Sequence, residues 1–302
     1  MLIALDTETL AELLADEHIL NRVKLECLLL PYMGLRPLSQ ITVPAEFPGG
    51  FEMGQRIDRA IKPHMDRLQA ITEPRAKVQA IQETRKHMET QFEAVVENSD
   101  PYKAYYSWSD RLGLKSEQAQ VRPTVHEIFL FKDGRDGKEL KRLIKDREKI
   151  RVRVQRRPDP QMGRIRFAYP EEFNAKWITR MGRLLGYPDC CIKQYAQDRV
   201  KGVNVETRAA TQLAEVLNEE KKVDAHAYIL GFFFPCRPDC PNSAEKGFRW
   251  HEEFSKMDER LGEMYAELLG VNATMVLRQP ELINRYISQF QKPAPEKDGA
   301  DG

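Results

Sequence analysis

The sequence lacks the motifs that identify several common enzyme classes. It has no G-x-x-x-x-G-K-[ST] phosphate-binding loop, no G-x-G-x-x-G turn, no H-E-x-x-H pair and no G-x-S-x-G nucleophile turn. Two glutamates follow His251, but the second histidine of a zinc-protease motif is missing. Nucleotide binding, zinc proteolysis and serine hydrolysis therefore have no support from the usual motifs.

Long apolar segments and a strong net charge are also absent. The longest apolar runs, Leu28–Leu30 and Ile229–Phe234, are far too short to span a bilayer, and residues 1–5 lack the basic start of a signal peptide. Charged residues make up 31% of the 302 residues, yet the net charge is only +1, so any affinity for nucleic acid must be local. We expect a soluble, cytoplasmic protein with no membrane partner.

Cysteine is scarce, and its distribution is the most informative feature of the chain. Four of the five cysteines form two close pairs, Cys190-Cys191 and Cys236-x3-Cys240, separated by a few dozen residues. Two ligand pairs with such a gap are the usual sequence form of a tetrahedral zinc site or an iron–sulfur site. An odd number of cysteines in a cytoplasmic chain fits poorly with structural disulfides. We therefore predict that these four residues bind a metal centre.

The surroundings of both pairs favour metal ligation. Pro188 suits the first turn of a helix, where free backbone amides and the helix dipole favour the thiolate forms of Cys190 and Cys191. Prolines also restrict the loop that presents Cys236 and Cys240, which lowers the entropy cost of holding both sulfurs in place. The C-x3-C spacing is wider than that of a simple zinc knuckle, so zinc and an iron–sulfur cluster both stay open.

Two further observations bear on the metal. His226 and His251 flank the second pair and are weaker ligand candidates, either of which could replace a cysteine. An adjacent pair followed by a close pair resembles the cysteine-rich domains of heterodisulfide reductase, which bind a non-cubane iron–sulfur cluster. The chain departs from that pattern because no glycine follows Cys191 and because three residues, not two, separate the last pair.

A closer resemblance lies within about residues 170–270. It is carried by Leu185-Gly186-Tyr187-Pro188-Asp189-Cys190-Cys191 and by Phe234-Pro235-Cys236 with Cys240. In these motifs the chain resembles an uncharacterised archaeal family catalogued as domain of unknown function 483. The resemblance implies an archaeal, cytoplasmic protein. It brings no established activity, and so it assigns no catalytic residues.

The apolar pattern predicts a mainly helical α+β fold. Helices are expected over 7–31, 51–71 and 74–97, the last two as an antiparallel pair. Cys27 lies on the apolar stripe of the first helix and is expected to be a buried core thiol. Residues 98–123 form an aromatic-rich connector whose rings should pack into the core.

The middle of the chain is predicted to form a small strand-containing unit. Residues 125–131 are expected to be a strand, and 137–149 a basic helix that follows a turn. Residues 151–155 and 164–168 alternate like the two strands of a hairpin that turns at 157–160.

This region is also locally basic. In a strand, Arg151 and Arg153 would share one face, because alternate side chains point the same way. With the neighbouring basic helix, residues 141–166 would then offer a surface for phosphates or RNA, although a solvated charged face paired with acidic helices is the alternative. The candidate phosphate or RNA contacts are Arg151, Arg153, Arg156, Arg157, Arg164 and Arg166.

Helices are predicted again around the cysteines. They are expected at 171–186, from Pro188 onward, at 204–222, at 243–269 and at 279–291, with a buried strand at 228–234. The predicted domains are a helical region at 1–123, a mixed α+β domain with the cysteine site at 124–291, and a disordered tail at 292–302.

Three functions stay open from the sequence. The first is a metal-binding protein with an iron–sulfur or zinc centre; an iron–sulfur version would be an oxidoreductase or cluster-dependent enzyme that serves a small molecule or a redox partner protein. The second is a zinc-stabilised module that binds RNA or protein through the basic 141–166 face. The third is a metal-free thiol redox protein. In the first, Asp189, Arg237 and Asp239 would tune the charge around the ligands.

Overall fold

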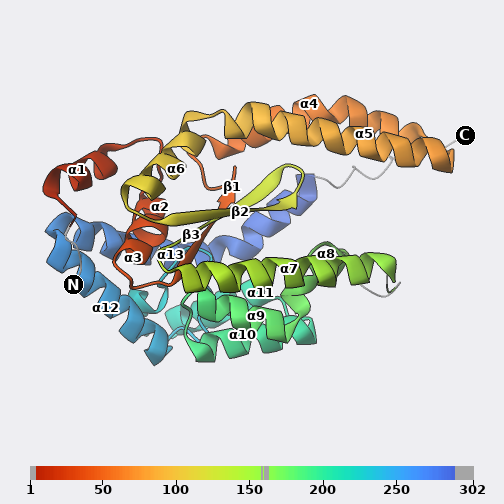
Figure 1. Ribbon diagram of the computed structural model, residues 1–302. Coiled ribbons are helices and arrows are strands. Elements are labelled where there is room, and N and C mark those ends of the chain that lie inside the picture. The colour runs from red at the N-terminus through yellow and green to blue at the C-terminus, as the bar shows by residue number, and fades with distance from the viewer. Residues whose placement is uncertain (1–4, 158, 160–162, 290–302) are drawn as a thin grey trace, which may run out of the picture.

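The computed structural model describes residues 5–157, 159 and 163–289. The fold is mainly helical α+β, as predicted, with helices packed around a three-stranded antiparallel sheet of strand order β1-β3-β2 (Figure 1). Within these ranges, no helix combines the length and the apolar character that crossing a bilayer requires.

The sheet separates two hydrophobic cores. Its strands are β1 (Leu38–Val43), β2 (Lys115–Arg122) and β3 (Val125–Phe131), of which only the last was predicted. Successive side chains of β3 point to opposite faces. Ile128 and Leu130 join the larger core, whereas Phe129 and Phe131 pack against the helices on the other side.

The predicted continuous helix over 7–31 is wrong in its middle. The chain forms α1 (Thr7–Ala15), α2 (Asn21–Val23), the π-helical η1 (Lys24–Leu29) and α3 (Leu30–Tyr32). Asp16 accepts hydrogen bonds from the His18 backbone amide at 2.8 Å and from Trp108 Nε1 at 2.7 Å. A side chain that bonds the local backbone competes with helix continuation. Cys27 is buried, as expected.

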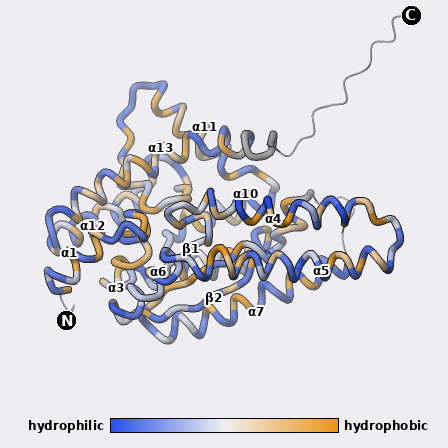
Figure 2. Tube along the Cα trace, turned by 90° about the horizontal axis from the view of Figure 1, so that it is seen from above, coloured by the Kyte–Doolittle hydropathy of each residue, from blue (hydrophilic) through white to orange (hydrophobic). Residues whose placement is uncertain are grey.

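A long helical pair projects from the body of the molecule (Figures 1 and 2). It consists of α4 (Gly50–Ala70) and α5 (Pro74–Phe92), followed by the π-helical η2 (Glu93–Glu97), and it confirms the predicted antiparallel pair. The aromatic connector that follows contains α6 (Asp100–Arg111), in which Tyr105 and Trp108 are buried as expected.

The predicted strands after residue 150 are wrong. Residues 151–155 belong to the last turns of α7 (Gly134–Arg156), and 164–168 form the short helix α8 (Arg164–Ala168). The predicted turn at 157–160 includes positions 158 and 160, which lie outside the described residues. α7 buries Leu140, Leu143 and Arg147 against the sheet side, a spacing of three and four residues that only a helix aligns.

The chain from residue 170 onward is helical, as predicted, but its helices begin and end at different residues from those predicted. It contains η3 (Pro170–Phe173), α9 (Ala175–Leu184), α10 (Asp189–Lys201), α11 (Val205–Asn218), η4 (Ala225–Ala227), α12 (Pro241–Met257) and α13 (Glu259–Gln289). The predicted helix over 243–269 is divided at Asp258, and α13 includes most of the helix predicted at 279–291. The predicted tail at 292–302 lies outside the described residues.

The predicted boundary at residue 123 runs through shared structure. β1 and β2 precede it and β3 follows it, and the larger core draws on both sides. The division into two regions stays a prediction.

A buried glutamate explains why 228–234 is irregular and not the predicted strand. Glu26 in η1 accepts the backbone N–H of Gly231 at 2.9 and 3.0 Å, and Asn272 Nδ2 donates to it at 3.1 Å. Arg22 pairs with the same carboxylate at 3.2 Å. The Gly231 N–H is thus bonded to a side chain and not to a neighbouring strand, and this contact helps to fix the segment that leads to Cys236.

Glu26→Ala should lower the free energy of unfolding by about 2–4 kcal/mol, because it removes a fully buried carboxylate that accepts from Gly231 N–H and Asn272 Nδ2 and leaves Arg22 with Glu46 alone. Urea unfolding followed by circular dichroism measures this. Glu263→Gln, on an exposed part of α13, is the matched control and should stay within about 0.5 kcal/mol of wild type. An equal, small loss in both variants would contradict the role of Glu26.

Candidate metal centre

The first cysteine pair lies where α10 begins, as the sequence predicts. Gly186, with φ of +77°, ends the preceding helix, and Pro188 takes the N-cap position of α10. α9 and α10 pack closely because Gly182 lies under Ile192; a Cβ at this glycine would come within 2.8 Å of Ile192 Cγ1. Cys190 and Cys191 therefore occupy the first turn of a firmly held helix.

The second pair is presented by the loop before α12. Cys240 is the N-cap of α12, and a proline at the first helical position follows it. Arg208 in α11 donates to the carbonyl oxygens of Cys236 at 3.2 Å and Pro235 at 3.4 Å, and its Nε lies 2.7 Å from Asp198 Oδ2. The loop is thus held from the side by a half-buried ion pair.

The four sulfurs converge on one point. The Sγ atoms of Cys190 and Cys191 lie 3.8 Å apart, and each lies 3.6 Å from Cys240 Sγ. With Cys236, all four lie within 4.8 Å of one another, close enough to hold a metal ion. None of the pairs is bonded as a disulfide, which requires about 2.05 Å between sulfurs.

The backbone and one amide favour negative charge on these sulfurs. The Cys236 backbone N–H donates to Cys191 Sγ at 3.4 Å, and Asn242 Nδ2 donates to Cys190 Sγ at 3.3 Å. The N-termini of α10 and α12 both meet here, so the positive ends of two helix dipoles face the cluster. A tetrathiolate metal site carries net negative charge, which this arrangement suits.

The thiols differ in their acidity. Burial raises the pKa of Cys190, but hydrogen bonds from Asn242 and the neighbouring thiols outweigh it, so the pKa lies below its ordinary value. Burial raises the pKa of Cys191 and also that of Cys236, the latter to about 11. Cys190 is therefore readier to ionise than Cys191 and Cys236, and those two thiols need a cation to do so.

The donor set fits a soft, tetrahedral ion. Four thiolates select zinc or iron, and hard cations such as Mg²⁺ and Ca²⁺ prefer oxygen. Cys191 and Cys240 are buried, and Cys190 and Cys236 are partly accessible. An ion can thus reach the cluster from one side and would be shielded on the other.

The other predicted ligands lie apart from this point. His226 Nε2 contacts His251 Nδ1 at 3.2 Å, and His226 Nδ1 contacts Asp224 at 2.9 Å. Asp189 pairs with Arg183 at 2.9 Å, and Arg237 pairs with Asp239 at 3.2 Å, both at the exposed surface. These charges lie close to the ligands in sequence and are largely solvated.

The basic residues do not form the expected face. In α7, Arg151 and Arg153 point to different sides, because residues two positions apart in a helix are rotated by about 200°. Arg151 is bound to Glu171 and donates to the Val121 carbonyl at 3.2 Å, whereas Arg153, Arg156 and Arg157 are exposed. Arg166 lies over the Phe173 ring. Phosphate or RNA binding by the remaining arginines stays a prediction.

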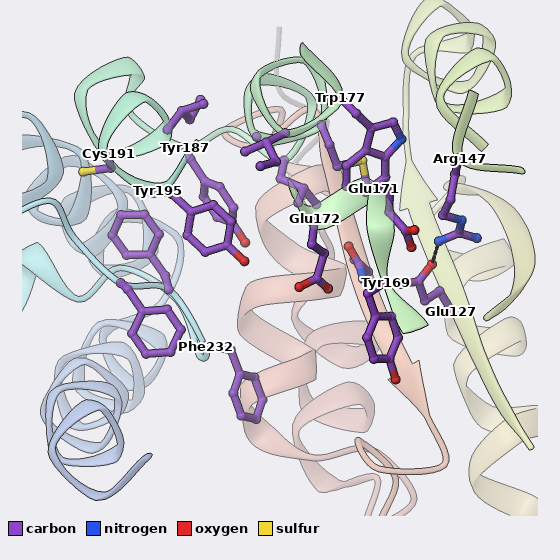
Figure 3. A pocket seen from close by; sticks show the side chains of 18 of the residues that line it. Glu127, Arg147, Tyr169, Glu171, Glu172, Trp177, Tyr187, Cys191, Tyr195 and Phe232 are labelled. Atoms are coloured by element: carbon purple, nitrogen blue, oxygen red, sulfur yellow. Dashed lines mark hydrogen bonds and ion pairs between the residues drawn. The ribbon is translucent and has the colours of Figure 1, made fainter. Parts of the chain in front are cut away.

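A cavity lies beside the cysteines, and no pattern in the sequence predicts it. A space of about 330 Å³ is bounded by Cys191, Ile192 and Tyr195 of α10 and by the loop Phe232–Phe234 (Figure 3). Its far side is formed by η3, α7 and the sheet, and it contains three glutamates, Glu127, Glu171 and Glu172. Their positions in the chain follow no common spacing, so only the fold brings them together.

Cys27 should behave differently from the other cysteines. It is buried, its thiol donates to the Gln40 carbonyl at 3.8 Å, and burial raises its pKa to about 12. In the folded protein, iodoacetamide at neutral pH should leave Cys27 unmodified even after a chelator exposes Cys190. Peptide mass spectrometry reads both sites, with the urea-unfolded protein as the control. Equal rates at the two sites in folded protein would contradict this assignment.

The part of the chain that contains the four clustered cysteines is similar to known proteins. Residues 140–268 match the family described as "Protein of unknown function (DUF483)". The chain is also similar to "Uncharacterized protein MJ1106" of Methanocaldococcus jannaschii, with 32% identity over 83 residues; this covers 26% of the chain and 44% of that archaeal protein, less than half its length. No solved structure matches the chain. The matched residues, 140–268, contain all four clustered cysteines, so the similarity to the DUF483 family includes the candidate metal centre.

Proposed function

We propose that the chain binds one zinc ion through Cys190, Cys191, Cys236 and Cys240. The observation that carries the proposal is the spacing of the sulfurs. Zinc–sulfur bonds of about 2.3 Å in a tetrahedron require sulfurs about 3.8 Å apart. The separations among Cys190, Cys191 and Cys240 are 3.6, 3.6 and 3.8 Å, close to this value, and Cys236 Sγ lies within 4.8 Å of all three.

The same spacing argues against an iron–sulfur cluster. In a four-iron cluster each cysteine binds a different iron, so the sulfurs must lie farther apart than they do around one ion. A two-iron cluster needs two separated pairs of sulfurs. Here Cys240 is equally close to both members of the first pair, which favours a single central ion.

The proposed ion has a structural role. Four protein ligands leave no open position for a substrate or an activated water. The ion would join the first turn of α10 to the loop that leads into α12, two segments whose ligands are far apart in the chain. The ion would cross-link these two segments and neutralise the charge of the thiolates. Arg208 and Asn242 would hold the ligands in position.

Metal analysis of protein purified anaerobically under reducing conditions should find about one zinc per chain, no acid-labile sulfide and no visible absorption. Cys236→Ser should lose most of the zinc, because one of its four bonds is removed. Cys27→Ser is the matched control and should retain it, since Cys27 lies outside the cluster. Brown protein with iron and sulfide would overturn the choice of zinc, and a chain without metal would leave thiol redox chemistry as the alternative.

Arg208→Met should weaken zinc binding about 10–100-fold, the usual effect of removing a group that orients metal ligands. Competition with a chromophoric chelator measures the affinity. Arg180→Met is the control, because Arg180 pairs with Glu139 and Asp146 on α7, and it should leave the affinity unchanged. An equal loss in both variants would point to general destabilisation in place of a role for Arg208.

A further inference from the structure

The cavity beside the metal centre has the size and lining of a small-molecule site. Its volume of about 330 Å³ falls at the lower end of the range for ligand pockets, about 300–1,000 Å³. Ile178, Met181 and Ile192 supply an aliphatic wall, and several aromatic rings supply the rest. The polar groups are few and are concentrated on the side of η3 and α7.

Two of the three carboxylates in the cavity are neutralised. Glu171 is bound by Arg151, whose Nε lies 3.1 Å from each of its carboxylate oxygens. Glu127 is bound by Arg147 and accepts a hydrogen bond from Gln40 Nε2 at 2.8 Å. Both pairs are internal to the protein and leave little charge to offer a ligand.

Glu172 is different because its charge is not balanced. Its nearest recorded cation is Arg199 at 3.9 Å, and that guanidinium lies closer to Glu206, at 2.8 Å, and donates to the Tyr195 hydroxyl at 3.1 Å. No hydrogen bond to the Glu172 side chain is found among the described residues. Burial raises the pKa of this carboxyl, and the distant Arg199 offsets only part of that effect. Three carboxylates and two guanidinium groups line the cavity, and Arg199, which lies outside the lining, is shared between Glu172 and Glu206, so Glu172 has no cation of its own.

Aromatic side chains surround this carboxylate. Figure 3 shows the Glu172 side chain directed into the cavity, with the hydroxyl groups of Tyr187 and Tyr195 on one side and the Tyr169 ring on the other. Phe232 closes the space from the loop. An ammonium group suits such a site, since the carboxylate pairs with its charge, the tyrosine hydroxyl oxygens can accept its hydrogen bonds, and a nearby ring can attract it.

We infer that the cavity binds a small organic amine, with its ammonium group on Glu172 and its apolar part against the wall formed by α9 and α10. An anionic ligand is disfavoured by the carboxylates of the cavity, and a neutral one would leave Glu172 with only its long ion pair to Arg199. The inference rests on the proposed function only because the zinc ion would hold α10 and the Phe232–Phe234 loop in place.

The test uses three probes of one size that differ in charge: benzylamine, benzyl alcohol and benzoate. Isothermal titration calorimetry on the wild-type protein as purified should show benzylamine binding at least tenfold more tightly than benzyl alcohol, with benzoate the weakest. This comparison needs no variant, so a folding defect cannot obscure it. Equal affinity for all three, tighter binding of benzoate, or no binding of any of them would overturn the inference.

Glu172→Gln should then reduce the affinity for benzylamine at least tenfold, to near that of the alcohol, and leave the affinity for the alcohol unchanged. Glu215→Gln, on the exposed side of α11, is the matched control and should bind like wild type. An unchanged benzylamine affinity in Glu172→Gln would remove Glu172 from the site. Zinc content is measured on each protein, so that amine binding without zinc sinks the proposed function alone, and zinc without amine binding sinks this inference alone.

Discussion

Four cysteine sulfurs lie within 4.8 Å of one another where α10 and α12 begin, and much of the surrounding structure depends on what holds them there. Four thiolates at this distance repel one another strongly, and four neutral thiols gain little from such close approach. A divalent cation removes the repulsion, and two helix N-termini and the donors Cys236 N–H and Asn242 Nδ2 accommodate the remaining negative charge. A metal ion is therefore the simplest physical account of why this chain brings its cysteines together.

The loop from 228 to 240 connects the cysteine cluster to the amino-terminal part of the chain, which contains Glu26. Glu26 holds Gly231 near one end, and Cys236 and Cys240 hold the other. Between them, Phe232 has φ of +60°, a left-handed conformation that is uncommon for a bulky residue and that persists only where its surroundings impose it. Phe232 also lines a second cavity of about 340 Å³, on the side of Arg22 and Glu26. Fixing both ends of the loop thus determines the wall that the two cavities share.

The sequence predicted that the four cysteines would lie together, but it predicted the surrounding structure less well, for physical reasons. Cysteines at close spacing are informative by themselves, because few other roles require them in a polar, proline-rich loop. The strand predicted at 151–155 was wrong because five alternating residues are too few to distinguish a strand from the end of a helix. The packing of α7 against the sheet favours the helix. The strand predicted at 228–234 failed because its bonding partner is Glu26, some two hundred residues away. Glu172 could not have been found, since only its lack of a close partner distinguishes it from other glutamates.

Two parts of the chain line the cavity beside the cysteines. Residues 140–268, which match the family, supply the cysteines, Glu172, Tyr195 and the loop with Phe232. Gln40, Val121 and Glu127 come from the sheet outside that segment and complete the far side. Gln40 and Glu127 bond to each other across β1 and β3, and Arg147 of the family segment joins them. The cysteines proposed to bind zinc and the carboxylate proposed to bind an amine thus both lie within residues 140–268. α9 and α10 of this segment form the apolar wall, whereas the far side of the cavity comes from a sheet that the segment does not contain. The same segment packed against a different sheet would therefore leave a cavity of a different size.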